Sequence, residues 1–387
     1  MAINIQNLID VVNAKLTAAD SATPAQELIK LYQVKNDIDA SVGVLSYGSL
    51  KSLPTASGAN AGEIVFIDDT KYDKYGTFYF SNGSEWTRLN LTTDSDEDQL
   101  IFSHAFPGNI YGYAAGGFEL AVTSYIDRYA FASDGNAVLV GNLTLARESS
   151  SGQKSSTYGY TAGGVTPSSN NTIDKFEFLN ETNATDVGDL VANLHRMAGH
   201  SSQTNGYVSG GRTNTAIQKW PFSTDTNATS VGTLTYNLDY VAGISTFDYN
   251  SAYTTGGFPA AANYIQKFPF SNESLGIDVG DLYVVRYWHS SQSGFQYGYS
   301  FGSATTDNTI IEKFPYAVET TSIYVGDLLS GISEPNGSSS RENVYSTGGS
   351  APAVINVIQK WPYAVDQNAT DVGDLTSIRM SPAGNQV

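Results

Sequence analysis

The chain contains no cysteine, which excludes disulfide bonds, thiolate metal sites and cysteine nucleophiles. Only four histidines occur, so a metal centre built on histidine is not expected. Charged residues make up 15% of the 387 residues and the formal net charge is −18, so we expect no basic face that binds nucleic acid. No apolar run reaches about 18 residues, and the first residues lack the basic and apolar segments of a secretory signal. Neither a membrane span nor a signal peptide is therefore expected.

What the sequence does contain is a repeat. A Gly-Gly pair, preceded by a Tyr, recurs at intervals of about 46 residues. The pairs are Gly116-Gly117, Gly163-Gly164, Gly210-Gly211, Gly256-Gly257 and Gly348-Gly349, and Gly302-Ser303 fills the one gap. A glycine pair allows a backbone turn where a Cβ atom would clash.

Two further markers follow each pair in the same order. The first marker has the pattern Ile-x-Lys/Arg-aromatic-x-aromatic and begins at Ile126, Ile173, Ile217, Ile265, Ile311 and Ile358. The second has the pattern Val-Gly-x-Leu and ends at Leu143, Leu190, Leu234, Leu282, Leu328 and Leu375. Each unit contains about four short strands bounded by turn residues. The fold class is therefore mainly β, and residues 100–387 are predicted to form a six-bladed β-propeller.

The end of the chain predicts how the ring closes. Residues 379–384 (RMSPAG) resemble residues 196–199 (RMAG), where a new unit opens. We expect the C-terminal strand to join the first blade beside residues 102–105, which would remove exposed sheet edges. A Pro inside the first marker of four units predicts a strand end or an edge strand.

The chain before residue 100 has a different pattern. Residues 1–45 contain apolar stripes at helical spacing and a capping box with Pro24 at its first helical position, which predict two helices. Residues 46–93 are predicted to form a small β module, with strands at residues 62–67 and 76–80. The acidic residues 94–99 are interpreted as a linker.

The repeat resembles the kelch-type propeller repeat, in which spaced aromatics follow a Gly pair, although Trp is rare here. It is more similar to propeller repeats in tail-fibre and other virion proteins of marine bacteriophages, especially those that infect cyanobacteria. Residues 5–10, 17–20 and 76–86 look like the attachment ends of such proteins. The resemblance implies a non-enzymatic virion protein without a cofactor. Residues 1–90 would then bind other virion proteins and form a homo-oligomer, while the propeller loops bind a host surface glycan or protein.

Several residues are candidates for receptor binding. Four arginines recur near the second marker, either to pair with Asp189, Asp281 and Asp374 or to hold an anionic group on one face: Arg147, Arg196, Arg286 and Arg379. The densest aromatic cluster, which could stack on sugars or pack in the core, is Tyr287, Trp288, Phe295 and Tyr297. The segments that differ most between units, and so are candidates for recognition loops, are residues 165–172, 212–216, 258–264, 304–308 and 350–356.

The six basic residues of the first marker (Arg128, Lys175, Lys219, Lys267, Lys313 and Lys360) are interpreted as strand residues with solvated head groups, in preference to a glycan-binding ring. No catalytic residue and no metal ligand are assigned, since the histidines share no register and each repeat offers one Asp. Two other functions stay open. One is a polysaccharide depolymerase, which needs a pair of carboxylates about 5–10 Å apart. The other is a purely architectural neck, tail or capsid component.

Overall fold

The computed structural model describes residues 110–387, except 179, 181, 213, 247–249, 260, 261, 295 and 319, and four strands between residues 45 and 89. Contacts divide the chain into two units, residues 1–104 and 105–387. The two predicted helices and the acidic linker lie outside the described residues. In the first unit, β1 (Leu45–Tyr47), β2 (Ile64–Ile67), β3 (Thr77–Ser81) and β4 (Trp86–Leu89) form one sheet in sequence order. β1 is parallel to β2, and the other neighbours are antiparallel.

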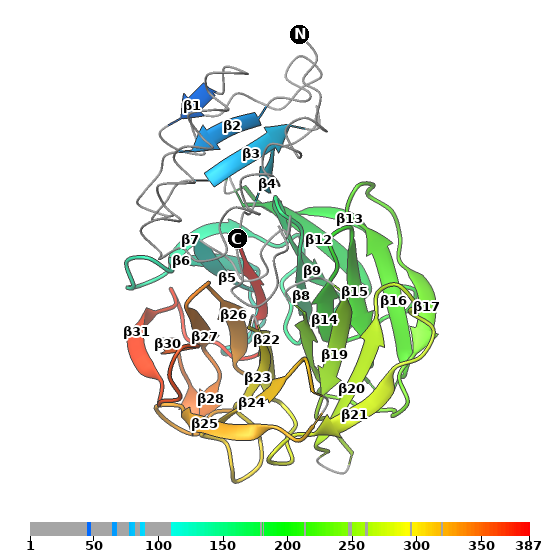
Figure 1. The fold of residues 1–387 in the computed structure, drawn as a ribbon, viewed down its shortest axis with the longest axis vertical. Coiled ribbons are helices and arrows are strands. Elements are labelled where there is room, and N and C mark those ends of the chain that lie inside the picture. The colour runs from blue at the N-terminus through cyan, green and yellow to red at the C-terminus, as the bar shows by residue number, and fades with distance from the viewer. Residues whose placement is uncertain are drawn as a thin grey trace, which may run out of the picture. The chain divides into compact units, whose positions relative to one another are not determined.

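The second unit is a six-bladed β-propeller, in which six four-stranded antiparallel sheets surround a central axis (Figure 1). The first three blades, innermost strand first, are β32 (Ala383–Gln386), β5 (Tyr111–Ala115), β6 (Tyr125–Ala130), β7 (Val138–Asn142); β8 (Ser151–Lys154), β9 (Tyr158–Ala162), β12 (Thr172–Glu177), β13 (Thr185–Asp189); and β14 (Ala198–Ser201), β15 (Asn205–Ser209), β16 (Ala216–Pro221), β17 (Thr229–Thr233).

The last three blades are β18 (Ala242–Ser245), β19 (Ser251–Thr255), β20 (Tyr264–Pro269), β21 (Ile277–Asp281); β22 (Ser290–Ser293), β23 (Tyr297–Phe301), β24 (Ile310–Pro315), β25 (Ile323–Asp327); and β26 (Asn336–Ser339), β27 (Asn343–Thr347), β30 (Val357–Pro362), β31 (Thr370–Asp374). The short pairs β10 (Val165–Thr166) with β11 (Ser168–Ser169) and β28 (Ser350–Ala351) with β29 (Ala353–Val354) form hairpins in two loops. In four blades the third strand ends on its Pro, which confirms the predicted strand end.

The predicted ring closure is confirmed. β32 is the innermost strand of the first blade and pairs antiparallel with β5, from Ala383 opposite Ala115 to Gln386 opposite Gly112. The partner is therefore β5 and not the expected residues 102–105, which lie outside the described part of the chain. β32 also contacts the innermost strands on both sides, β8 and β26, so that the six innermost strands form a continuous ring.

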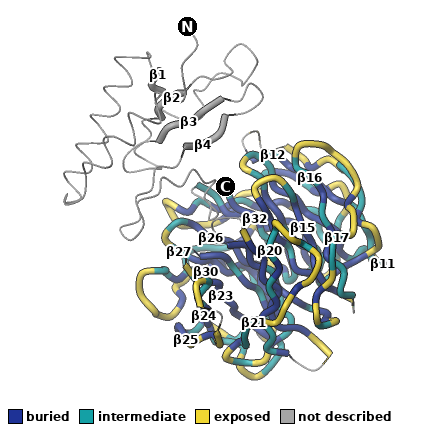
Figure 2. The backbone as a smooth tube through the Cα atoms, turned by 45° about the vertical axis from the view of Figure 1, so that its right-hand side comes forward, coloured by how far each residue is buried: buried dark blue, intermediate teal, exposed yellow. Residues whose placement is uncertain are grey.

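Aromatic side chains hold neighbouring blades together. The buried Tyr160 of the second blade lies 6.5 Å from Trp220 and 4.8 Å from Phe222 of the third, measured between ring centroids. The equivalent tyrosines, each 1% exposed, are Tyr113, Tyr207, Tyr253, Tyr299 and Tyr345. Such aromatic pairs contribute about 0.5–1.5 kcal/mol each beyond the area that they bury. The Tyr before the Gly pair and the two aromatics of the first marker thus form the interblade core, which appears as the buried interior in Figure 2.

The basic residues of the first marker add a second link between blades. Lys175 pairs with Asp225 of the next blade at 2.7 Å, and Lys219 pairs in the same way with Glu273. Lys313–Asp366 and Lys360–Asp134 repeat the arrangement. In these four blades the head group is therefore held by a carboxylate instead of standing free in water. This pairing supports the structural interpretation of these residues over a glycan-binding ring.

Candidate binding site

Six loops join the outermost strand of one blade to the innermost strand of the next, and we call them the interblade loops. One residue of each loop has a left-handed backbone with φ between 53° and 61°. These residues, which we call the rim residues, are Ser149, Arg196, Tyr240, Trp288, Glu334 and Ser381. All of them are half-buried, and all line one cavity at the propeller axis.

Backbone hydrogen bonds join neighbouring rim residues. The N–H of Arg196 donates to the carbonyl of Ser149 at 2.8 Å, and that of Ser149 donates to Ser381 at 3.0 Å. Ser381 donates to Glu334 at 2.9 Å, and Glu334 donates to Trp288 at 2.8 Å. A left-handed conformation is uncommon for a residue with a side chain. Because all six loops adopt it with different residues, the conformation belongs to the fold, while the side chains distinguish one blade from another.

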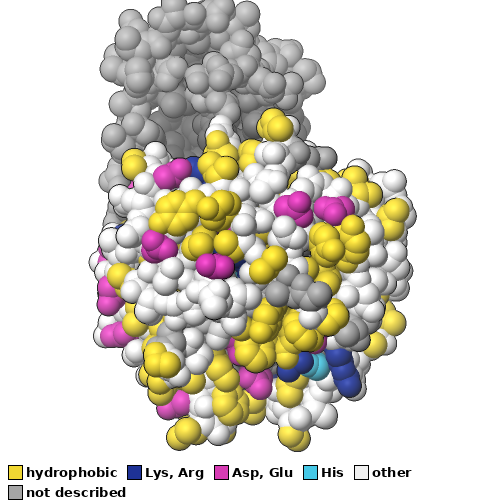
Figure 3. Space-filling view, turned by 90° about the horizontal axis from the view of Figure 1, so that it is seen from below, with side chains coloured by type: hydrophobic (Ala, Val, Ile, Leu, Met, Phe, Trp, Pro, Cys, Tyr) yellow, Lys and Arg dark blue, Asp and Glu magenta, His cyan; other side chains and the backbone are white. Residues whose placement is uncertain are grey.

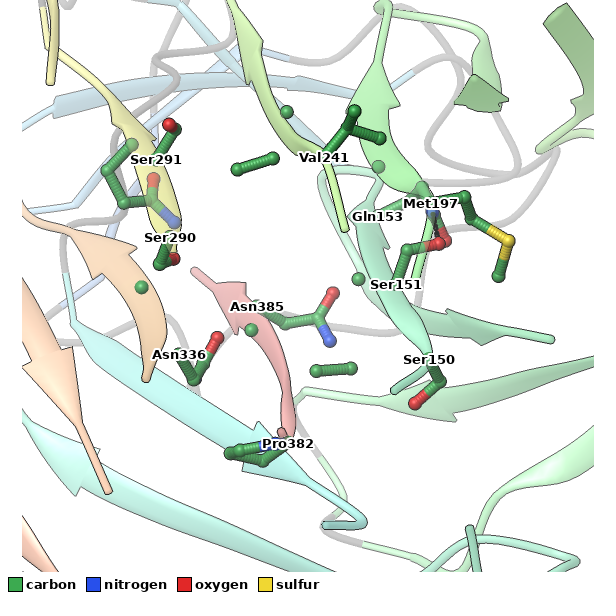
Figure 4. A pocket seen from close by; sticks show the side chains of 18 of the residues that line it. Ser150, Ser151, Gln153, Met197, Val241, Ser290, Ser291, Asn336, Pro382 and Asn385 are labelled. Atoms are coloured by element: carbon green, nitrogen blue, oxygen red, sulfur yellow. Dashed lines mark hydrogen bonds between the residues drawn. The ribbon is translucent and has the colours of Figure 1, made fainter. Parts of the chain in front are cut away.

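The cavity inside the rim has a volume of about 160 Å³ and is lined by the six innermost strands (Figure 4). These strands approach one another closely at their second residue, which is Gly in five blades. A Cβ atom on Gly152 would lie 1.9 Å from the carbonyl oxygen of Gly384, so this position of β8 accepts no side chain. Serine, glutamine and asparagine side chains supply most of the polar lining, among them Ser151, Ser290 and Asn385.

Aromatic rings cover one side of the cavity mouth. Trp288 and Tyr240 are both rim residues, and their ring centroids lie 4.9 Å apart at an interplanar angle of 72°. Tyr287 packs beside them, 5.4 Å from the ring of Phe258. Tyr287 and Trp288 are candidates from the sequence, and Phe258 begins one of the candidate recognition loops, residues 258–264, whereas Tyr240 belongs to neither set. Tyr240 follows the second marker at the same distance as Trp288, and aligning the six units at that marker would have identified it.

The predicted aromatic cluster is not a single cluster. Tyr297 begins β23, at the far end of the hairpin whose first strand starts just after Trp288. Since the two ends of this hairpin lie at opposite ends of the blade, Tyr297 and Trp288 belong to opposite faces of the propeller. Tyr297 packs against the core there, with the ammonium of Lys313 4.8 Å from its ring centroid. Phe295 lies outside the described residues.

Three of the four candidate arginines have no contact with solvent. Arg147, Arg286 and Arg379 are each 0% exposed. Arg147 pairs with Asp174 at 3.0 Å, and the other two pair with Glu312 and Asp127. The expected pairing with Asp189, Asp281 and Asp374 is therefore wrong, and these guanidinium groups cannot hold an anion at the surface.

A β-bulge explains this choice of partner. In every blade the register between the third and fourth strands shifts just after the Ile of the first marker, between Ile173 and Asp174 in the second blade. Such a bulge redirects the next side chain. That side chain then accepts a hydrogen bond from the interblade loop, as Asp174 does from the N–H of Thr144 at 2.9 Å. Where this residue is Gln218, Gln266 or Gln359, the position of Arg147 is taken by Leu194, Leu238 or Ile332.

Arg196 differs from the other arginines because it stands two residues further along its loop, on the rim. Its guanidinium lies 4.1 Å from the ring centroid of Tyr240 and 3.4 Å from a carboxylate oxygen of Asp239. Its side chain is 33% exposed. Arg196 is thus positioned to meet a ligand at the mouth of the cavity.

Two carboxylates lie on the same face. Glu334 is a rim residue and accepts a hydrogen bond from the hydroxyl of Ser381, and Glu148 directly precedes the rim residue Ser149. Burial raises the pKa of both carboxyls, and the charge of Glu334 adds to the rise for Glu148. Elsewhere, acidic side chains are scattered over the face of the molecule shown in Figure 3 and form no single patch.

The described part of residues 110–387 contains no group of three His, Asp or Glu side chains placed to hold a metal ion. In the same part of the chain, no helix is long and apolar enough to cross a membrane. Comparisons of the chain with models of known protein families and with curated proteins gave no match.

Proposed function

We propose that this chain is a bacteriophage virion protein, a tail fibre or appendage, whose propeller binds the host surface through the face that carries the rim residues. The observation that carries the binding role is the contrast between one backbone repeated six times and six rim positions occupied by Ser, Arg, Tyr, Trp, Glu and Ser. These side chains are half-buried and line the mouth of the cavity, so their differences between blades set what a ligand meets there. The virion setting follows from the resemblance of the repeat to phage propeller repeats.

The position of the loops that differ between units also indicates that binding occurs on the face with the rim residues. The second residue of each Gly pair donates a backbone hydrogen bond to the following interblade loop, as Gly164 does to the carbonyl of Leu194 at 2.8 Å. Four of the five Gly pairs, and Gly302-Ser303, directly precede the segments that differ between units, so these segments begin close to the interblade loops. Arg212 and Ser169, from two such segments, hydrogen-bond at 3.0 Å. Variable loops on a rigid scaffold are where recognition usually lies.

The remaining parts of the proposal concern assembly. Residues 1–90 fix the protein to other virion proteins and associate into a homo-oligomer, so that several propellers face one cell. Aromatic and uncharged polar contacts of this kind are individually weak, and linking several of them raises avidity without any new contact.

Binding of the labelled protein to cells of candidate host bacteria tests this function, with competition against phage adsorption as a second readout. We expect Trp288→Ala and Tyr240→Ala to weaken cell binding about tenfold or more, since aromatic anchors dominate such contacts. Tyr324→Ala is the matched control, because this exposed tyrosine lies on β25 at the outer edge of its blade. Equal binding by all variants, or a cryo-EM image with the rim buried among other virion proteins, would contradict the proposal.

The two carboxylates favour one alternative, a polysaccharide depolymerase. A carboxyl with a raised pKa can act as a general acid beside a second carboxylate. Incubating the protein with host lipopolysaccharide distinguishes the two functions. Shortened chains with the wild type and intact chains with Glu334→Gln would establish cleavage, whereas binding without shortening supports attachment alone.

A further inference from the structure

We propose that the axial cavity binds a small, neutral, polyhydroxylated ligand, namely one terminal sugar residue of a surface glycan. This inference rests on the proposed function in that it names the ligand class for the same face. It is carried by a buried side chain in the cavity that has no partner in the protein.

That side chain is Asn385, on the innermost strand β32. It is 2% exposed, and among the described residues neither its amide oxygen nor its amide nitrogen has a hydrogen-bond partner. Figure 4 shows the side chain extending into the cavity between the innermost strands. The protein therefore does not use the hydrogen-bonding groups of this amide, and both its donor and its acceptor are available to a ligand in the cavity.

The equivalent positions in other blades behave differently. His200, the third residue of β14, bonds through Nδ1 to the carbonyl of Ile244 at 3.1 Å and through Nε2 to Ser209 at 2.8 Å. Ser338, the third residue of β26, bonds to the hydroxyl of Tyr129 at 2.5 Å. Gln153, the third residue of β8, is satisfied in part: its amide nitrogen donates to the hydroxyl of Ser151 at 2.8 Å, while its amide oxygen has no partner among the described residues. Asn385 differs from all three in that both of its amide atoms are without a partner there.

Other unpartnered polar atoms line the same cavity. They are the amide oxygen of Gln153, the hydroxyl of Ser150 and the indole nitrogen of Trp288, and they come from two further blades and their loops. Together with Asn385 they offer both donors and acceptors, and none of them is charged. A sugar ring presents hydroxyl groups that donate and accept in several directions, which matches this set.

The aromatic side of the mouth provides the apolar contact. Tyr240 and Trp288 stand there at 72° to each other, so that a ring entering the cavity meets an aromatic edge or face. The C–H groups of a sugar ring pack on such faces, while its hydroxyl groups point away toward polar partners. Trp288 and Asn385 line the same cavity, so we expect one entering sugar to meet both.

The charges around the cavity favour a neutral ligand over an anion. On the rim, Arg196 is held by Asp239, and Glu334 of opposite charge lines the same mouth. Lys154 lines the far end of the innermost strand β8, where burial lowers its pKa to about 7. Among the described residues that line the cavity, no two cations are thus placed to bind a carboxylate or sulfate together.

The size of the cavity limits the ligand to a single ring. Its volume is about 160 Å³. Pockets for drug-sized ligands are larger, at about 300 Å³ or more. An extended oligosaccharide therefore does not fit inside, and only a terminal residue would enter while the rest of the chain crosses the rim and the variable loops.

Saturation-transfer NMR with the methyl glycosides of glucose, galactose, mannose and rhamnose, and with glucuronate as the charged probe, tests the inference on the full chain. We expect at least one neutral glycoside to bind with a Kd on the order of 1 mM. Asn385→Leu and Trp288→Ala should each weaken it about tenfold. Asn385→Leu should leave the melting temperature close to that of the wild type, because no hydrogen bond to a described residue is lost. Asn368→Ala, which removes an amide bonded to the N–H of Asp327 in an outer loop, is the control that should leave binding intact.

Three results would overturn the inference: no neutral glycoside binds, binding survives Asn385→Leu, or glucuronate binds more tightly than every neutral glycoside. The cell-binding assay separates this failure from that of the proposed function. If wild type and Asn385→Leu bind cells equally well, sugar binding in the cavity plays no part in attachment, while the proposed host attachment stands. If Asn385→Leu abolishes glycoside binding and the protein binds no host cell, the sugar site in the cavity is supported and the proposed host attachment is contradicted.

Discussion

Arg147 and Asp174 form an ion pair with an Nη1–Oδ2 distance of 3.0 Å, and neither side chain is exposed to solvent. Arg147 also donates to the carbonyl of Thr161 at 2.9 Å, while Asp174 accepts hydrogen bonds from Thr144. The next blade has Leu194 and Gln218 at the same two positions. One chain thus contains both a charged and an uncharged solution to the same packing problem.

This comparison predicts the effect of exchanging the pair. Asp174→Ala alone should lower the free energy of unfolding by about 3–5 kcal/mol, because it leaves the buried guanidinium of Arg147 without a counter-charge. The double variant Arg147→Leu/Asp174→Gln, which copies the third blade, should stay within about 1 kcal/mol of the wild type. Urea denaturation measures both. A double variant no more stable than Asp174→Ala would show that the two solutions are not interchangeable.

The ion pair between Lys175 and Asp225 should contribute much less. The side chain of Asp225 is 51% exposed, so water screens the attraction and competes for both groups. We expect Lys175→Met to lower the free energy of unfolding by less than about 1 kcal/mol. Cell binding should not change, since Lys175 lies on the third strand β12 and Asp225 in the loop between β16 and β17, and neither belongs to an interblade loop. If Lys175→Met loses cell binding, the alternative interpretation of the basic residues as a glycan-binding ring would be supported instead.

The buried histidine His200 predicts a pH dependence of stability. Burial lowers its pKa from 6.5 to about 4. The unfolded chain therefore binds a proton between these two values while the folded chain does not, and stability is lost as the pH falls from about 6.5 to about 4. The free energy of unfolding, measured across this range, should have a smaller slope in His200→Gln. His195 and His289, whose pKa values are also lowered, remain in both proteins as a common background. Identical slopes would contradict the assignment.

Ring closure predicts that the last few residues are essential for stability. Deleting residues 382–387 removes β32 and leaves the edge of β5 unpaired, which favours aggregation. We expect a lower melting temperature and higher oligomers in size-exclusion chromatography. Deletion of Val387 alone is the milder control, because it leaves β32 in place and removes only the backbone bonds of this residue with Ile110 and Tyr111 and its packing against the core of the first blade. Normal behaviour of the longer deletion would mean that the ring holds without its closing strand.

Much of the architecture could be predicted from the repeat. The number of blades, the strand ends at Pro and the closing strand all depend on local patterns that recur along the chain. The candidate site was predicted less well. Trp288 and Tyr287 were identified because aromatics cluster there, whereas Tyr240 has no adjacent aromatic, the nearest being Tyr236, and becomes part of the site only through the ring. Arg147 and Arg196 look alike in sequence, but one is buried and the other stands on the rim.

The sequence by itself determined a ring of six units, since glycine pairs and spaced aromatics dictate local turns and strands that neighbouring units must cover. Only the tertiary structure decided which side chains meet a ligand. A shift of two residues within an interblade loop separates the core position of Arg147 from the left-handed rim position of Arg196. Asn385 belongs to a cavity because ring closure brings β32 to the axis, between strands that lie far away in the sequence. Such contacts depend on the whole ring, and no single repeat encodes them.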